Sequence, residues 1–188
     1  MLAFVKTSAI RLAILIGVCL LGLSAGPTGA QSEDVLPQLQ ADFLKVIERA
    51  RQMYAAGDTD LQKGAARPTR AKALCALLSG RRVERWVGTV ERLTTNSAGR
   101  GVISIDAGQK THLMTYSNAL SDYGDDTMLD PDGRLFSVAM SLKKGDKITF
   151  SGSFLPGERD CIREVSLTMA GSIREPWFIF RFAHINKQ

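Results

Sequence analysis

The chain has 188 residues, a net charge of +5 at pH 7 and 45% hydrophobic residues, a length for one domain or one domain with an appendage. Its charge is mildly basic, and the basic residues are interspersed with acidic ones. Domains that bind nucleic acid usually carry a concentrated basic stripe, so composition does not favour that class.

The first 30 residues have the layout of a secretory signal peptide. Lys6 and Arg11 are the charged residues of this segment, and small residues precede a predicted cleavage after Ala30. An apolar run from Leu12 to Ala25 lies between Arg11 and these small residues, and it is shorter than the about 20 residues that a membrane span needs. An uncleaved anchor is the alternative. We expect a periplasmic or secreted protein with no membrane span once the signal is removed.

Cys75 and Cys161 remain after signal cleavage. Exported proteins fold in an oxidising compartment, where an even pair of cysteines predicts a disulfide. The alternative is two separate buried thiols.

Residues 31–66 are expected to form an amphipathic helix and a linker. Between Asp34 and Ala56 apolar residues recur in alternating steps of three and four, the spacing of a heptad seam, although fewer than three heptads are present. The pattern predicts a helix over 34–56 that docks on its own domain, and a homodimer paired through this helix is the alternative. The seam residues are Leu36, Leu39, Phe43, Val46, Ala50 and Met53.

Residues 67–188 are expected to form a barrel domain with a leading helix over about 69–79. Gly88 in the first strand marks a bulge or a tight bend, where one strand serves both halves of a small barrel. A last strand, 177–184, with Phe178, Phe180 and Phe182 on one side, is expected to extend the sheet or cover its edge. The chain is thus predicted to be mainly β with N-terminal helices, forming a five-stranded Greek-key barrel of the OB type. Its predicted strands are 83–93, 101–107, 110–116, 147–154 and 162–170. A helix is predicted over 134–143, between the third and fourth strands, and its residues Leu135, Val138, Ala139 and Leu142 share one face.

Two glycine-punctuated stretches, Trp86 to Val90 and Gly145 to Gly152, carry a family resemblance. They resemble a group of exported bacterial OB-fold proteins, similar in outline to tRNA-anticodon-binding-type barrels, over about residues 82–185. The resemblance implies an OB-like barrel but carries no catalytic residues across. It concerns shape, because an exported address argues against tRNA as the ligand.

No motif assembles a catalytic or metal site. His112 and His184 lie about 70 residues apart, and neither has a partner at metal-ligand spacing. The acidic run from Asp122 to Asp132 is the best metal candidate, but an EF-hand register fails in it, and a solvated loop with a helix cap is the preferred interpretation. We therefore expect no metal, no cofactor and no enzymatic activity.

OB barrels bind ligands on the face of strands two and three and between the loops that join strands one to two and four to five. Four residues in these places are candidate ligand-binding residues: Asn96, Arg100, Tyr116 and Arg159. The leading hypothesis is a non-enzymatic exported module that engages a protein or an envelope component. The alternative is an oligonucleotide- or oligosaccharide-binding protein that uses the barrel groove, with nucleic acid not favoured because few exposed aromatic residues are expected.

Overall fold

The computed structural model describes residues 36–158 and 160–188, which belong to one compact unit. The signal peptide expected over residues 1–30 and the candidate residue Arg159 lie outside the described residues. Within the described part, no helix is both long enough and apolar enough to cross a membrane.

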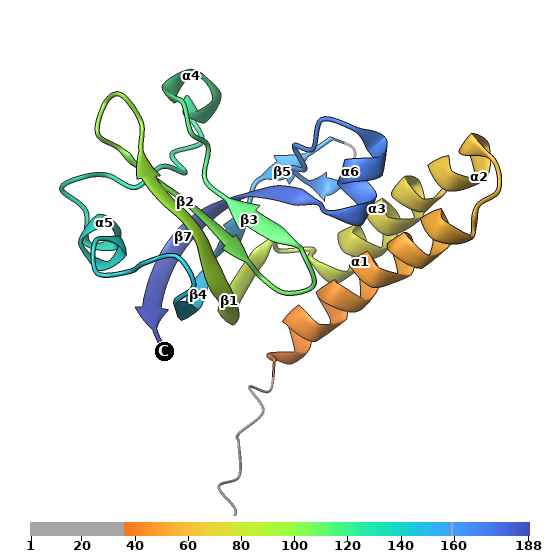
Figure 1. The fold of residues 1–188 in the computed structure, drawn as a ribbon, viewed down its shortest axis with the longest axis horizontal. Coiled ribbons are helices and arrows are strands. Elements are labelled where there is room, and N and C mark those ends of the chain that lie inside the picture. The colour runs from red at the N-terminus through yellow and green to blue at the C-terminus, as the bar shows by residue number, and fades with distance from the viewer. Residues whose placement is uncertain (1–35, 159) are drawn as a thin grey trace, which may run out of the picture. The chain divides into compact units, whose positions relative to one another are not determined.

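Five strands close into a barrel with the order β1-β2-β3-β7-β4 (Figure 1). β3 and β7 run parallel and the other neighbouring pairs run antiparallel. Two further strands of two residues each, β5 and β6, form a separate small hairpin. The bounds are β1 Arg82–Thr95, β2 Gly101–Asp106, β3 His112–Met114, β4 Lys147–Phe154, β5 Pro156–Gly157, β6 Cys161–Ile162 and β7 Trp177–Lys187.

Helices and strands take similar shares of the described residues, so the expectation of a mainly β chain is wrong. The additional helix comes partly from the expected linker, which contains α2 and the start of α3. Thr59 and Gln62 form a capping box at α2, and Pro68 lies in the first turn of α3, where a missing N–H is tolerated. The bounds are α1 Gln38–Ala56, α2 Asp60–Gly64, α3 Ala66–Leu77, α4 Ala119–Asp122, α5 Arg134–Ala139 and α6 Met169–Arg174.

β1 is shared between two neighbours, as the sequence predicts. Its first half pairs with β4 and its second half with β2, and the change of partner falls at Thr89, next to Gly88. A Cβ on Gly88 would lie 2.5 Å from Ile105 Cγ2 and 2.8 Å from the Asp106 carbonyl oxygen. Gly88 is therefore needed for the close approach of β1 to β2, while the register shifts of β1 lie on either side of it.

The fifth barrel strand is β7, and the predicted strand over 162–170 is wrong. Val165, Leu167 and Met169 alternate in the sequence, yet all three are exposed and Leu167 completely so. Thr168 begins α6 instead, because its Oγ1 accepts a hydrogen bond from the Gly171 N–H. The phenylalanines of β7, predicted to share one side, are buried: Phe178, Phe180 and Phe182.

Helix α1 docks on its own barrel, the interpretation preferred from its pattern. Phe43 is fully buried, with its ring 5.1 Å from that of Trp86 between centroids. Gln40 is also fully buried, and its amide bonds both the N–H and the carbonyl of Val87 and the carbonyl of Ala107. α1 is thus held by both the core and the backbone of the sheet.

Candidate binding site

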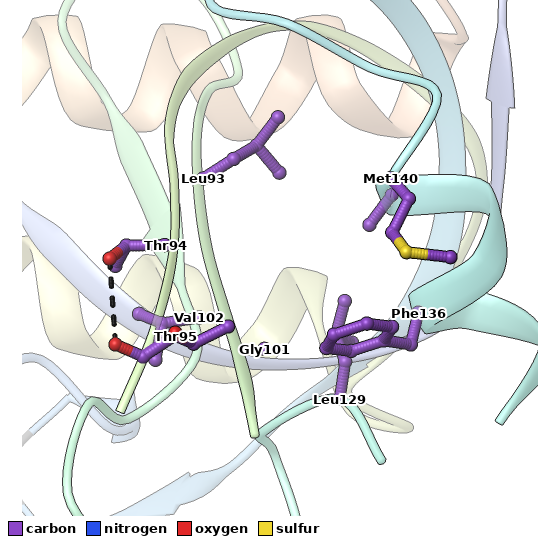
Figure 2. A pocket seen from close by; sticks show the side chains of 9 residues that line it. Leu93, Thr94, Thr95, Gly101, Val102, Leu129, Phe136 and Met140 are labelled. Carbon is purple, nitrogen blue, oxygen red and sulfur yellow. Dashed lines mark hydrogen bonds between the residues drawn. The ribbon is translucent and has the colours of Figure 1, made fainter. Parts of the chain in front are cut away.

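An apolar pocket lies between the end of the β1–β2 hairpin and α5. Its volume is about 310 Å³. Figure 2 shows the hairpin residues Leu93 and Val102 on one side and Phe136 and Met140 on the other. We call it the α5 pocket; its lining is Leu93, Thr94, Thr95, Gly101, Val102, Leu129, Phe136, Ala139 and Met140.

Gly101 and the buried carboxylate of Asp122 determine the shape of this pocket. Gly101 and Leu129 exchange two backbone hydrogen bonds of 2.9 Å, and a Cβ on Gly101 would lie 3.0 Å from both Leu129 Cβ and Phe136 Cδ2. The segment before Leu129 is fixed by Asp122, which is 3% exposed and accepts bonds from the Thr127 N–H at 2.7 Å and the Met128 N–H at 3.1 Å. These hydrogen bonds fix the backbone at Leu129, against which a bound group would pack.

The lining allows binding but not acid–base chemistry. None of the nine residues that line the pocket carries a titratable side chain. Its polar side chains are those of Thr94 and Thr95, and the Thr94 hydroxyl donates a hydrogen bond to the Thr95 backbone carbonyl at 3.5 Å (Figure 2). Met140 is 70% exposed at the edge, and its flexible thioether can adapt to different apolar shapes. The pocket is suited to a single apolar group.

The structure brings three of the four predicted ligand-binding residues to the loop over 122–129. The Asn96 carboxamide oxygen accepts bonds from the N–H groups of Ala98 and Arg100, which shapes the β1–β2 turn. Arg100 Nη2 donates to the Met128 carbonyl at 3.2 Å, and the Tyr116 N–H donates to Thr127 Oγ1 at 2.8 Å. Each of these contacts is made to the chain itself, and a role in ligand binding stays a prediction. Arg159 is not described.

Asp125, a residue of the acidic run, makes an ion pair within the chain. Asp125 pairs with Arg163, whose Nη1 also donates to the Tyr116 hydroxyl at 2.8 Å; this hydrogen bond is the main cause that raises the pKa of Arg163. In the part of the chain that the structure describes, no group of three or more His, Cys, Asp or Glu side chains is placed to hold a metal ion.

A second hollow, of about 790 Å³, lies on the outer face of the barrel between β1–β3 and the segment before β7. We call it the outer groove; its lining includes Glu91, Met114, Leu167, Glu175 and Trp177. It is larger and more polar than the α5 pocket.

His112 lies behind the outer groove, in contact with three of its lining residues, and is 4% exposed. Its ring stacks on Trp177 with centroids 4.0 Å apart. Nδ1 lies 2.8 Å from Glu91 Oε2 and Nε2 lies 3.0 Å from Glu175 Oε1. Among the described residues, no hydroxyl or thiol is hydrogen-bonded to this ring, so His112 is not arranged with a nucleophile.

Comparisons with models of protein families, with curated proteins and with solved structures gave no match. The function proposed below therefore depends on the geometry of this chain alone.

Sequence reasoning missed the lining of the α5 pocket. Leu135, Val138, Ala139 and Leu142 are predicted to share one face of the helix over 134–143, and the sequence analysis assigns no role to Phe136 and Met140. These two residues stand four apart, the spacing of neighbours on a helix surface. This second apolar pair, outside the predicted face, is the signal that could have indicated the pocket.

Proposed function

We propose that the protein is an exported, non-enzymatic binding module that engages a protein or an envelope component through an apolar group held in the α5 pocket. The observation that carries this proposal is the lining of the pocket, which is apolar and free of titratable side chains. Ligand pockets typically measure about 300–1,000 Å³. A volume of about 310 Å³ fits one large side chain or a short alkyl chain rather than a large cofactor.

The OB type of the barrel is part of the proposal. It is supported by the strand order β1-β2-β3-β7-β4 with a parallel β3–β7 pair, and by the position of α5 in the chain between β3 and β4. With β7 as the fifth strand, no extra C-terminal strand is needed for a Greek-key barrel of this type.

Export to the periplasm or beyond is also proposed. It is supported by the signal-like layout of residues 1–30 and by the disulfide between Cys75 and Cys161, whose Cα atoms lie 5.4 Å apart, because such bonds persist mainly in oxidising compartments. Protein recovered from the producing cells should have a mass that corresponds to a chain beginning at Gln31.

The pocket is tested by photo-cross-linking in the producing cells, with a photoreactive benzophenone amino acid in place of Met140. We expect a covalent adduct with a discrete protein partner, identified by mass spectrometry. Ala139→Phe fills the pocket and should reduce the adduct about tenfold, because one large buried side chain contributes about 1.5–3 kcal/mol when it leaves water.

The matched control is Ser137→Phe, which adds the same ring to an exposed position of α5 and should leave the adduct unchanged. Both variants are first shown to melt like the parent protein. If no adduct forms, or if Ala139→Phe and Ser137→Phe give equal yields, the α5 pocket is not the binding site.

Binding of an oligosaccharide in the outer groove is the second candidate. Trp177 is partly exposed there and is held in place by its stack on His112, so it offers an aromatic face, while Glu91 and Glu175 offer oxygens that can accept hydrogen bonds from hydroxyls. These two carboxylates outnumber Arg92, the one arginine of the groove lining, and disfavour the phosphates of a nucleic acid. In the cross-linking experiment, the photoreactive residue in place of Leu167 would capture a glycan if this candidate holds.

A further inference from the structure

A third hollow, of about 660 Å³, lies between α1 and α3. We call it the α1–α3 groove. Ala50, Ala73 and Ala76 contribute short side chains, while Val46 and Met53 are larger and partly exposed. Figure 1 shows α1 and α3 lying side by side, and the groove follows this contact. The lining is completed by Lys45, Arg49, Thr69, Arg70 and Lys72.

The polar side chains along the groove are strongly biased toward positive charge. None of the ten lining residues is acidic. Arg49 and Lys72 are exposed, and within the described part of the chain neither has an ion-pair partner. Lys45 is paired with Asp42 at 3.0 Å, and the buried guanidinium of Arg70 is paired with Asp160 at 3.2 Å. Arg49 and Lys72 are therefore the two charges that remain available to a partner.

This charge pattern argues against a second copy of the chain as the occupant. A two-fold dimer would place the same patch on both sides of the interface. The cations of one copy would then face those of the other, and like charges at close range repel. The homodimer considered from the heptad spacing would use the same surface, because Val46, Ala50 and Met53 belong to the predicted seam.

The form of the groove favours a helix over a membrane surface. Short side chains let another backbone approach closely, and an amphipathic helix binds by laying its apolar stripe into such a groove. A flat bilayer would reach the cations but not the apolar residues between the helices. A volume of about 660 Å³ also exceeds what one side chain fills.

We propose that the α1–α3 groove docks an amphipathic helix of a partner protein, with acidic residues on both sides of its apolar stripe. The apolar stripe contacts Val46, Met53 and the alanines, and the acidic residues pair with Arg49 and Lys72. This contact lies on the helical pair and does not involve the α5 pocket.

The test is fluorescence anisotropy with labelled synthetic peptides of about 20 residues, which span about 30 Å as a helix. One peptide carries leucines at i, i+3, i+4 and i+7 flanked by glutamates, and the other carries lysines in place of the glutamates. We expect the glutamate peptide to bind the protein, to bind more weakly as salt is raised, and to bind more tightly than the lysine peptide.

The combined change Arg49→Glu and Lys72→Glu should weaken binding of the glutamate peptide about tenfold or more and should create binding of the lysine peptide. The control is Arg134→Glu with Lys144→Glu, the same charge change at two exposed positions of the α5 region, which should alter neither affinity.

Three results would overturn the proposal. The first is no binding of the glutamate peptide, or equal binding by the reversed variant. The second is binding to vesicles of anionic lipid that the reversal abolishes while neither peptide binds, which would assign the groove to a membrane surface. The third is a dimer mass in sedimentation that the reversal converts to a monomer mass. The peptides and the Arg49→Glu, Lys72→Glu variant probe the α1–α3 groove and not the α5 pocket. If the peptides fail to bind, the cross-linking result at Met140 is therefore unaffected.

Discussion

Gly88 is one of the residues on which the close packing of the barrel strands depends. A Cβ at this position would lie 2.5 Å from Ile105 Cγ2 and 2.8 Å from the backbone oxygen of Asp106. The side-chain atom could move, but the carbonyl belongs to β2 and is fixed by the sheet. Any larger residue would push β1 and β2 apart at the point where β1 changes partner.

We expect Gly88→Ala to lower the free energy of unfolding by about 1–3 kcal/mol, the usual cost of inserting a methyl group into a tightly packed site. Urea denaturation measures this. Gly80→Ala is the matched control, because a Cβ there meets no atom within 4 Å, and this change should be neutral or slightly stabilising. Equal effects of the two substitutions would show that close approach at Gly88 is not limiting.

At the residue scale, the sequence could predict where a glycine was needed but not which polar side chains are used by the chain itself. Asn96, Arg100 and Tyr116 are predicted ligand-binding residues because they lie in the loops and at the strand end where OB barrels bind ligands. The structure shows that all three contact the chain between Asp122 and Met128 or its partner Arg163. Such contacts join residues far apart in sequence, and no local pattern reports them.

At the scale of elements, the alternation of apolar and polar residues predicted a strand correctly where the segment pairs with strands on both sides. It failed where a helix N-cap lies within the alternating segment. β4 alternates exposed and buried residues as predicted. The segment over 162–170 has the same alternation, but Thr168 caps α6 and the apolar side chains face solvent. For α1 the stripe predicted the buried Phe43 and Ala50, whereas the buried Gln40 is polar and was not predicted.

Asp146 connects the turn before β4 to the end of β7. Its Oδ2 accepts hydrogen bonds from Lys187 Nζ at 2.8 Å and from the Lys143 N–H at 3.0 Å. The bond from Lys187, followed by the bond from Lys143, holds the pKa of Asp146 below its ordinary value. Because the folded state then binds a proton less readily than the unfolded chain, the stabilisation is complete above the unfolded pKa of about 4 and is lost as pH falls through the folded value.

We therefore expect Asp146→Asn to be less stable than the parent protein at pH 7, with the difference shrinking as pH falls below about 4. Urea denaturation at a series of pH values gives this difference directly. Asp132→Asn, at an exposed aspartate of the same region, should show little difference at any pH. A gap between parent and Asp146→Asn that stays constant down to pH 2 would contradict the assignment.

At the scale of the whole molecule, apolar packing joins the helices to the barrel, and ion pairs join α3 to the β5–β6 hairpin and the residues that follow it. Arg67 pairs with Asp160 at 2.9 Å and with Glu164 at 3.2 Å, and both carboxylates are 1% exposed at the side chain. Arg70 pairs with Asp160 from the next turn of α3; burial is the main influence on its pKa and lowers it, and Asp160 opposes this. The sequence predicted a helix ahead of the barrel and a cysteine link, but not this buried ion network, in which Arg67 lies 93 residues from Asp160 and 97 residues from Glu164.

The disulfide between Cys75 and Cys161 joins the same two parts and closes a loop with a sequence separation of 86. For a loop of that length the chain-entropy model gives about 4–5 kcal/mol, and measured losses on removing a native disulfide are about 2–5 kcal/mol.

We expect the double change Cys75→Ser and Cys161→Ser to lower the free energy of unfolding by about 2–5 kcal/mol. The native circular dichroism spectrum should be retained, because the ion pairs and Phe43 still hold the helices. Urea denaturation is measured with and without a reducing agent. The reductant should destabilise the parent protein by as much as the double change does, and it should not affect the variant. A parent protein whose stability does not change with reductant would show that the bond contributes nothing to holding α3 to the β5–β6 hairpin.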